Sequence, residues 1–190
     1  MAHMAYKDRK TAQIAARILS LGGGTLNIVK LMKLLYLVDR EALSTVHRPL
    51  TGDRMVSMPR GPVLSRTYEA SQGAGNGAPG GWDSWIADRA NHLISIREGV
   101  TATREALDEL SDLDLTMIDK VWNQFGGMNQ WDLVDFTHNH CTEWVDPCGS
   151  SAKIEYETVL RAVGKSSEQA QEIAREIEAE NFLDATFARI

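Results

Sequence analysis

The sequence contains little of what marks a secreted, disulfide-rich or membrane-spanning protein. Only 2 of its 190 residues are cysteines, Cys141 and Cys148, whereas small secreted domains depend on several disulfides. No stretch approaches the ~18 consecutive apolar residues of a membrane span, and the first residues lack the basic-then-apolar layout of a secretory signal. We therefore expect a cytoplasmic protein with free thiols and no membrane association.

Phosphate-binding and catalytic motifs are absent as well. The glycines at 22–24 and 73–81 match neither a dinucleotide-binding fingerprint nor a phosphate loop. Asp132 and Asp135 do not form an acid–base arrangement, since Asp132 falls at a helix start and Asp135 on an ordinary helical turn. We predict that the protein is not an enzyme and uses no cofactor.

Four metal-capable side chains fall within eleven residues: His138, His140, Cys141 and Cys148. Their spacing differs from that of common zinc sites, and the adjacent His140 and Cys141 cannot easily share one tetrahedral ion. A nucleophilic Cys141 would need a catalytic signature that the surrounding sequence lacks. We predict no metal here, with zinc left as the open alternative, and expect His138 to bond to the backbone and pack near Trp144.

The charge of the chain is unevenly distributed along its length. The net charge is −6, yet residues 1–70 hold 11 Lys/Arg against 5 Asp/Glu, and residues 71–190 hold 9 against 21. A basic first half could meet phosphates or an acidic partner, while an acidic second half would repel nucleic acid. Solvated charged faces would produce the same counts, so both interpretations stay open.

Apolar periodicity, glycines and capping residues predict a helix at 10–19, ended by the glycines at 22–24, and a central core helix at 27–46 capped by Asn27. The other elements that we expect are helices at 64–71, 111–125, 129–138, 153–163 and 167–189, and strands at 55–58 and 93–96. We expect the 55–58 strand to lie at a sheet edge and to pair with the 93–96 strand. Residues 139–150 are expected to be irregular. The fold class is α+β, predominantly α-helical, with about seven helices around a central helix and a small antiparallel β-sheet.

We expect one domain over residues 5–190, because neither side of the glycine-rich loop at 71–81 shows a complete pattern alone. That loop has 5 glycines in eleven residues and is predicted to be mobile. Residues 1–4, Met-Ala-His-Met, read as an expression remnant. The amphipathic last helix is expected to dock on the core.

Several short motifs follow one another between residues 10 and 165. They are Lys33-Leu34-Leu35-Tyr36, Thr51-Gly52, Gly61-Pro62-Val63, Tyr68, Thr137-His138 and Trp144. In this order they resemble the Panacea family, the SocA-like antitoxin domain, in which an L-x-K-L-L-Y helix is followed by Thr-Gly, a G-P-V turn, a Tyr-bearing helix and a T-H…W element.

This resemblance implies a phage-associated antitoxin, encoded beside its toxin, that neutralises the cognate toxin by direct protein contact. SocA-like members also deliver the toxin to an ATP-dependent protease, so a proteolytic adaptor is an alternative. The opposite charges of the two halves would suit an adaptor with two binding faces.

The residue types that dominate protein interfaces provide the candidate contacts. Tryptophan, tyrosine and arginine combine a large contact area with a hydrogen-bonding group. Arg60 stands on a rigid turn, and Trp82 and Trp85 flank the glycine-rich loop, whereas we expect Trp122 and Trp131 to lie in the core. The predicted partner-binding residues are Tyr36, Arg40, Arg60, Tyr68, Trp82, Trp85 and Trp144.

A DNA-binding autoregulator is the weaker alternative. The helices at 10–19 and 27–46 could form a helix-turn-helix with Lys30, Lys33 and Arg40 near a groove. The second helix is rich in leucine, however, and the whole chain is acidic, which disfavours nucleic acid as the partner. The oligomeric state stays open.

Overall fold

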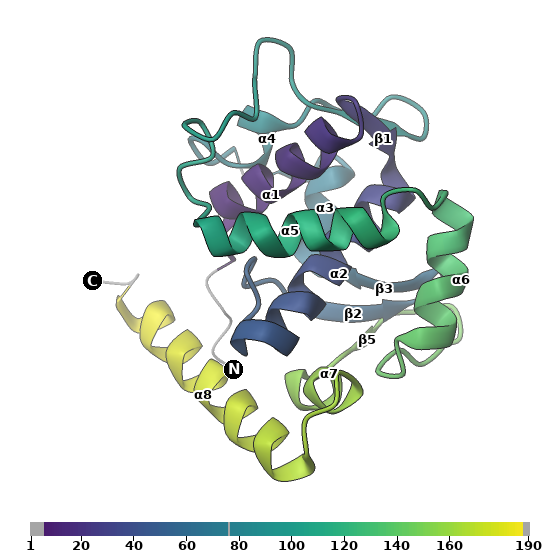
Figure 1. The fold of residues 1–190 in the computed structure, drawn as a ribbon, viewed down its shortest axis with the longest axis vertical. Helices are drawn as coiled ribbons and strands as arrows, with labels where there is room; N and C mark the ends of the chain where they lie inside the picture. The colour runs from purple at the N-terminus through teal and green to yellow at the C-terminus, as the bar shows by residue number, and fades with distance from the viewer. Residues whose placement is uncertain (1–5, 76, 188–190) are drawn as a thin grey trace.

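The computed structural model describes residues 6–75 and 77–187, so the predicted remnant at 1–4 lies outside the described residues. This part of the chain forms eight helices and two small antiparallel sheets (Figure 1). The predicted α+β, mostly helical class is therefore confirmed. None of the described helices is both long and apolar enough to cross a membrane.

The central helix α2 (Ile28–Val46) lies in the middle of the fold with 12 of its residues buried (Figure 1). It begins as predicted, because the Asn27 side chain accepts a hydrogen bond from the Val29 amide at 2.9 Å. Helix α1 (Asp8–Leu21) packs beside it. The chain leaves α1 through Gly23 and Gly24, whose φ angles of 82° and 90° are readily adopted only by glycine.

The larger sheet has the order β3-β2-β5, formed by β3 (Gly61–Leu64), β2 (Met55–Met58) and β5 (Ala152–Lys153). Because β2 lies between two neighbours, the prediction of an edge strand was wrong. Its second neighbour, β5, is a two-residue strand nearly 100 positions away, too short to leave a pattern in the sequence.

The smaller sheet pairs β4 (Leu93–Ser95) with β1 (Thr25–Asn27). The predicted pairing of this strand with β2 was wrong. Leu26 and Ile94 stand opposite each other in the register and are both buried, so their cross-strand contact accounts for the observed partner.

The remaining helices surround this centre. Capping boxes at Ser111 and Asn129 begin α5 and α6, as the sequence predicts. Asn139 and His140 are helical rather than irregular, and α7 begins three residues later than expected because Lys153 belongs to a strand. The elements are α3 (Ser65–Ser71), α4 (Trp82–Trp85), α5 (Asp112–Phe125), α6 (Gln130–His140), α7 (Tyr156–Ala162) and α8 (Ser167–Phe187).

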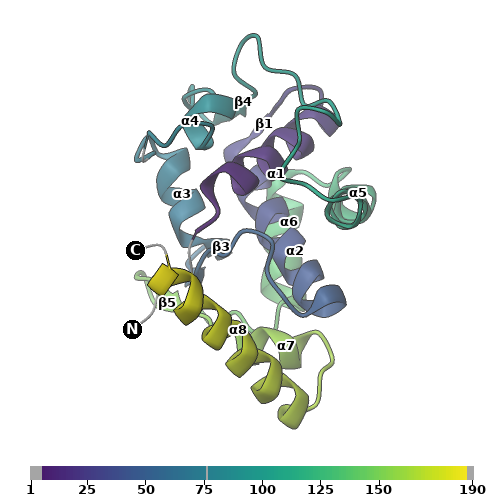
Figure 2. The same ribbon diagram turned by 90° about the vertical axis from the view of Figure 1, so that its left-hand side faces the viewer.

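Helix α8 runs along α7 at one end of the molecule (Figure 2). Ala170, Ile173 and Ile177 are buried on its inner side, so the last helix docks on the rest of the fold as expected. A single cluster of buried apolar side chains includes residues from α1, α2, both sheets, α5, α6, α7 and α8.

Candidate partner-binding site

Polar side chains are buried along one face of α2, and one of them, Lys33, reaches the β2–β3 hairpin. Lys33 and Tyr36 of α2 are 1% and 0% exposed. Together with Arg40 they follow the i, i+3, i+7 spacing that places side chains on one face of a helix. We call Lys33, Tyr36, Arg40 and Glu143, which is the partner of Tyr36 and Arg40, the buried polar layer.

Glu143 is the acceptor of this layer. The Tyr36 hydroxyl donates to Glu143 Oε1 at 2.6 Å, and Arg40 Nε donates to the same oxygen at 2.7 Å. The carboxylate side chain is 0% exposed. Burial, and then the charge of Glu143, raise the pKa of Tyr36 well above its usual value, so its hydroxyl stays a donor. Two donors on one buried carboxylate tie the segment after α6 to the central helix.

Lys33 contacts the hairpin instead. Its Nζ donates to the Pro62 carbonyl at 2.8 Å, and burial lowers its pKa to about 7. Gly61, with a φ of 93°, lies so close that a Cβ there would stand 2.8 Å from Lys33 Nζ and 2.7 Å from Thr137 Oγ1. Lys33, Gly61-Pro62 and Thr137, which belong to three different motifs, thus pack closely against one another.

The Thr51-Gly52 motif also has an internal role. The buried Asp39 carboxylate accepts hydrogen bonds from the amides of Leu50 and Thr51, and from the Thr51 hydroxyl. Asp53 in turn accepts from the amide and the hydroxyl of Thr67 in the first turn of α3. These carboxylates replace the backbone partners that the turning chain lacks, so this motif holds the chain between α2 and α3.

Trp144 joins the hairpin to α6. Its Nε1 donates to the Met58 carbonyl at 2.9 Å, and its ring stacks on His138 with the ring centroids 4.0 Å apart. The predicted packing of His138 near Trp144 is confirmed. The predicted bond to the backbone is not seen, since His138 Nε2 is buried without a hydrogen-bond partner among the described residues. Burial, and then the charge of Lys33, lower the pKa of His138.

The exposed surface next to this layer is aromatic and carries a cation. Arg60 is exposed at the hairpin turn, and its guanidinium carbon lies 5.8 Å from the centre of the Trp131 ring. Trp131 is 54% exposed and Val145, next to Trp144, is 69% exposed. These side chains come from the hairpin, from α6 and from the segment after it, which lie side by side in Figure 1. We call Arg60, Trp131, His138, Trp144 and Val145 the hairpin face.

The structure divides the predicted contact residues. It brings Arg60 and Trp144 together on the hairpin face. Tyr36 is 0% and Trp82 3% exposed, so these two are corrected to interior residues that offer no surface in this conformation. Arg40 is partly buried on Glu143.

Tyr68 and Trp85 are half-buried against the core, away from the hairpin face. The Trp85 indole N–H is also engaged, since it donates to the Gly80 carbonyl.

Sequence reasoning missed three residues of this region, Trp131, Glu143 and Val145. Trp131 was predicted to be buried but stands exposed, because the Asn129 cap places it in the first turn of α6, pointing away from the core. Glu143 had no signal of its own except that Tyr36 and Arg40, if buried, would require an acceptor.

The histidine and cysteine cluster does not converge. Cys141 is buried and Cys148 exposed, while His140 stacks on Phe136. Among the described residues no three or more His, Cys, Asp or Glu side chains are arranged to hold a metal ion. Burial raises the pKa of Cys141 to about 12, which leaves its thiol protonated and unreactive.

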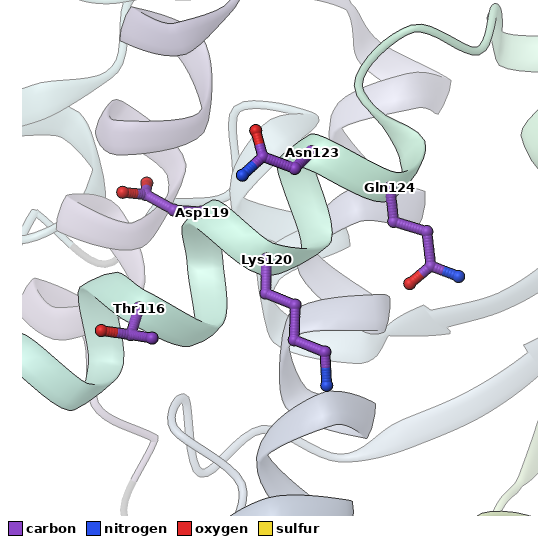
Figure 3. Close-up of a pocket in the computed structure, with 5 residues that line it drawn as sticks. All are labelled: Thr116, Asp119, Lys120, Asn123 and Gln124. Atoms are coloured by element: carbon purple, nitrogen blue, oxygen red, sulfur yellow. The ribbon is translucent and has the colours of Figure 1, made fainter.

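A surface depression on α5 is lined only by side chains of that helix (Figure 3). They are Thr116, Asp119, Lys120, Asn123 and Gln124. Asp119 is already paired with Arg17, and Lys120 with Glu41. The depression therefore presents the outer side of one helix rather than groups that converge from several elements.

The two oppositely charged halves of the chain meet between α1 and the α5 region. Each of these contacts joins a basic residue of the first half to an acidic residue of the second. The pairs are Arg9–Asp108, Lys10–Asp114 and Arg17–Asp119. Lys33 and Arg40, proposed for a DNA groove, lie in the buried polar layer, and Lys30 donates to the Gly126 carbonyl. The helix-turn-helix interpretation thus loses the cations on which it depended.

A model of one protein family, described as antitoxin SocA-like, Panacea domain, matches residues 31–145. This segment contains every residue of the buried polar layer and of the hairpin face. No curated protein and no solved structure matches the chain.

Proposed function

Because the chain belongs to the family of SocA-like Panacea antitoxins, we propose that it neutralises a cognate toxin by binding it directly through the hairpin face. It acts as one domain over residues 5–190, in the cytoplasm, without catalytic turnover. The toxin is encoded by the neighbouring gene.

The exposure of Trp131 carries this proposal. Trp131 is 54% exposed and Val145 is 69% exposed, and the Trp131 ring also contacts the Arg60 guanidinium. Exposed aromatic residues beside an arginine are the composition of an interface hot spot. The buried polar layer beneath fixes this surface, so it need not be ordered on binding.

Co-expression with the neighbouring gene product tests the proposal. We expect the wild-type chain to restore growth and to co-purify with the toxin. Trp131→Ala and Trp144→Ala should weaken both effects, while Phe182→Ala, which removes a 61% exposed ring on α8, should leave complex formation unchanged. A toxin that binds all variants equally would place the contact elsewhere on the molecule.

A protease adaptor is the second candidate, and one observation favours it. Phe182 and Leu183 of α8 are 61% and 52% exposed, and they lie on a different element from the hairpin face. This second apolar surface would serve a protease while the first holds the toxin. For an adaptor, Phe182→Ala with Leu183→Ala should keep toxin binding and abolish protease-dependent rescue; rescue that persists in a protease-deficient host would instead indicate masking.

A further inference from the structure

We propose that the Arg60–Trp131 pair is a preformed receptor for a carboxylate, and that the toxin presents to it an acidic side chain flanked by an apolar one. This inference rests on the proposed function and specifies the chemistry of the partner.

Arg60 and Arg66 differ from the five arginines that pair with carboxylates, because each lies over an aromatic ring instead, that of Trp131 and that of Tyr6. Arg9, Arg17, Arg40, Arg48 and Arg104 each lie within 4.0 Å of a carboxylate. Among the described residues Arg60 forms no ion pair, and its guanidinium lies over the ring of Trp131 instead. A guanidinium that rests on an aromatic face keeps the N–H groups of its edge available for a bidentate carboxylate.

The turn that carries Arg60 is anchored on both sides. Before it, the Met58 carbonyl accepts from Trp144 Nε1 at 2.9 Å, and after it, the Pro62 carbonyl accepts from Lys33 Nζ at 2.8 Å. The backbone of the turn is therefore held while the Arg60 side chain stays exposed. Such a receptor loses little conformational entropy when it binds.

The α6 N-terminus does not compete with Arg60 for an anion. In its first turn the amides of Trp131 and Asp132 donate to the Asn129 side chain, and the Asp132 carboxylate accepts from the Asn129 amide. The self-capped helix leaves the Arg60 guanidinium as the anion-binding group of the hairpin face.

The partner suited to this face is a protein carboxylate rather than a polyanion. The lowered pKa of His138 keeps that ring neutral at neutral pH, so Arg60 supplies the positive charge. Asp135 and Asp146 lie near enough to interact with His138 and would repel a row of phosphates. Trp131 and Val145 then contact the apolar neighbour of the acidic residue.

Arginine substitutions test the receptor against the purified product of the neighbouring gene. We expect Arg60→Glu to weaken toxin binding by about 100-fold, and Arg60→Lys by about 10-fold, because lysine lacks the bidentate edge. The matched control is Arg54→Glu, an exposed arginine at the other end of β2, with binding within about 2-fold of wild type. An Asp→Lys or Glu→Lys substitution in the toxin should restore binding to the Arg60→Glu variant. Wild-type affinity in Arg60→Glu would overturn the proposal.

A peptide titration separates this inference from the proposed function. The probe is N-acetyl-Leu-Glu-amide, with N-acetyl-Leu-Gln-amide as the uncharged control, followed through the indole N–H cross-peak of Trp131, which Trp131→Phe assigns. A shift caused by the Glu peptide and lost in Arg60→Glu supports the receptor even if the neighbouring gene product does not bind. An equal response to both peptides, or none, overturns the receptor whether or not the toxin binds.

Discussion

The buried polar layer and the hairpin face adjoin each other near Gly61 and use polar groups in opposite ways. In the layer, the charge of Arg40 and the hydroxyl of Tyr36 meet a carboxylate that is 0% exposed. On the hairpin face, Arg60 lies over an exposed ring and meets no carboxylate among the described residues. The comparison shows that the Lys, Tyr, Gly-Pro and Thr motif positions chiefly support the surface, while the exposed Trp131 and Val145, which lie outside those motifs, provide much of its area.

The largest expected loss of stability comes from removing the carboxylate acceptor of the buried polar layer. Glu143→Ala leaves the Arg40 guanidinium and the Tyr36 hydroxyl without their acceptor, so we expect the unfolding free energy to fall by about 3–5 kcal/mol. Urea denaturation followed by circular dichroism measures it. The control is Glu155→Ala, which breaks an exposed pair with Lys153 and should cost less than ~1 kcal/mol. Equal losses would mean that Glu143 does not stabilise the attachment of the segment after α6 to α2.

A Cβ added at Gly61, next to Lys33, should produce the next largest loss of stability. Gly61→Ala places a Cβ 2.8 Å from Lys33 Nζ at a φ of 93°, so we expect a loss of about 2–4 kcal/mol from strain and displacement. Gly73→Ala is the matched control, with a φ of 89° and nothing within 4 Å, and should lose only about 1–2 kcal/mol. Thermal unfolding compares the two variants, and an equal shift in Tm would show that the contact is not tight.

A smaller effect should appear in the pH dependence of stability. With a pKa of about 7 against ~10.4 in an unfolded chain, Lys33 binds fewer protons in the folded than in the unfolded state between these values. The contribution of Lys33 to the unfolding free energy of the protein should therefore rise as the pH increases from about 7 to about 10. Urea titrations at several pH values should show this rise in wild type and not in Lys33→Met.

The comparison of wild type with Lys33→Met also accounts for most of the opposing contribution of Cys141. The raised pKa of Cys141, about 12, lowers stability above the ordinary pKa of a thiol in both proteins, and the charge of Lys33 lowers that pKa in wild type only. Identical profiles would contradict the assignment of a shifted pKa to Lys33.

The smallest effect on stability should come from the hairpin face itself. Trp131→Ala removes a ring that is 54% exposed, so we expect the unfolding free energy to change by no more than ~1 kcal/mol. Its effect on toxin affinity should be far larger. A stability loss near that of Glu143→Ala would assign Trp131 to the supporting layer and remove the distinction between the two regions.

Sequence patterns predicted the helices well because their starts carry local signals. Asn27, Ser111 and Asn129 each accept hydrogen bonds from the helix that they precede, so the residue type alone marks the position. The sheets were predicted less well. Strands of two or three residues are too short for alternation to appear, and the partners β1 and β5 lie far from the strands that they pair with.

The candidate site was predicted only in part. Arg60 and Trp144 were recognised by residue type and position. Tyr36 and Trp82 were not distinguished from surface residues, because a buried aromatic with a bonded polar group has the same identity as an exposed one. Glu143 is one of 26 acidic residues, and only the fold brings it to Tyr36 and Arg40.

The ion pairs between α1 and the α5 region have a consequence for how the protein is made. As the chain leaves the ribosome, the first 70 residues emerge with an excess of six positive charges, and the carboxylates that pair with α1 follow only after about 100 residues. Until then the nascent segment is a polycation with its apolar helices uncovered. A chain that stops before Asp108 lacks the carboxylates that pair with Arg9, Lys10 and Arg17, and its uncovered apolar helices leave the truncated product prone to aggregation or degradation.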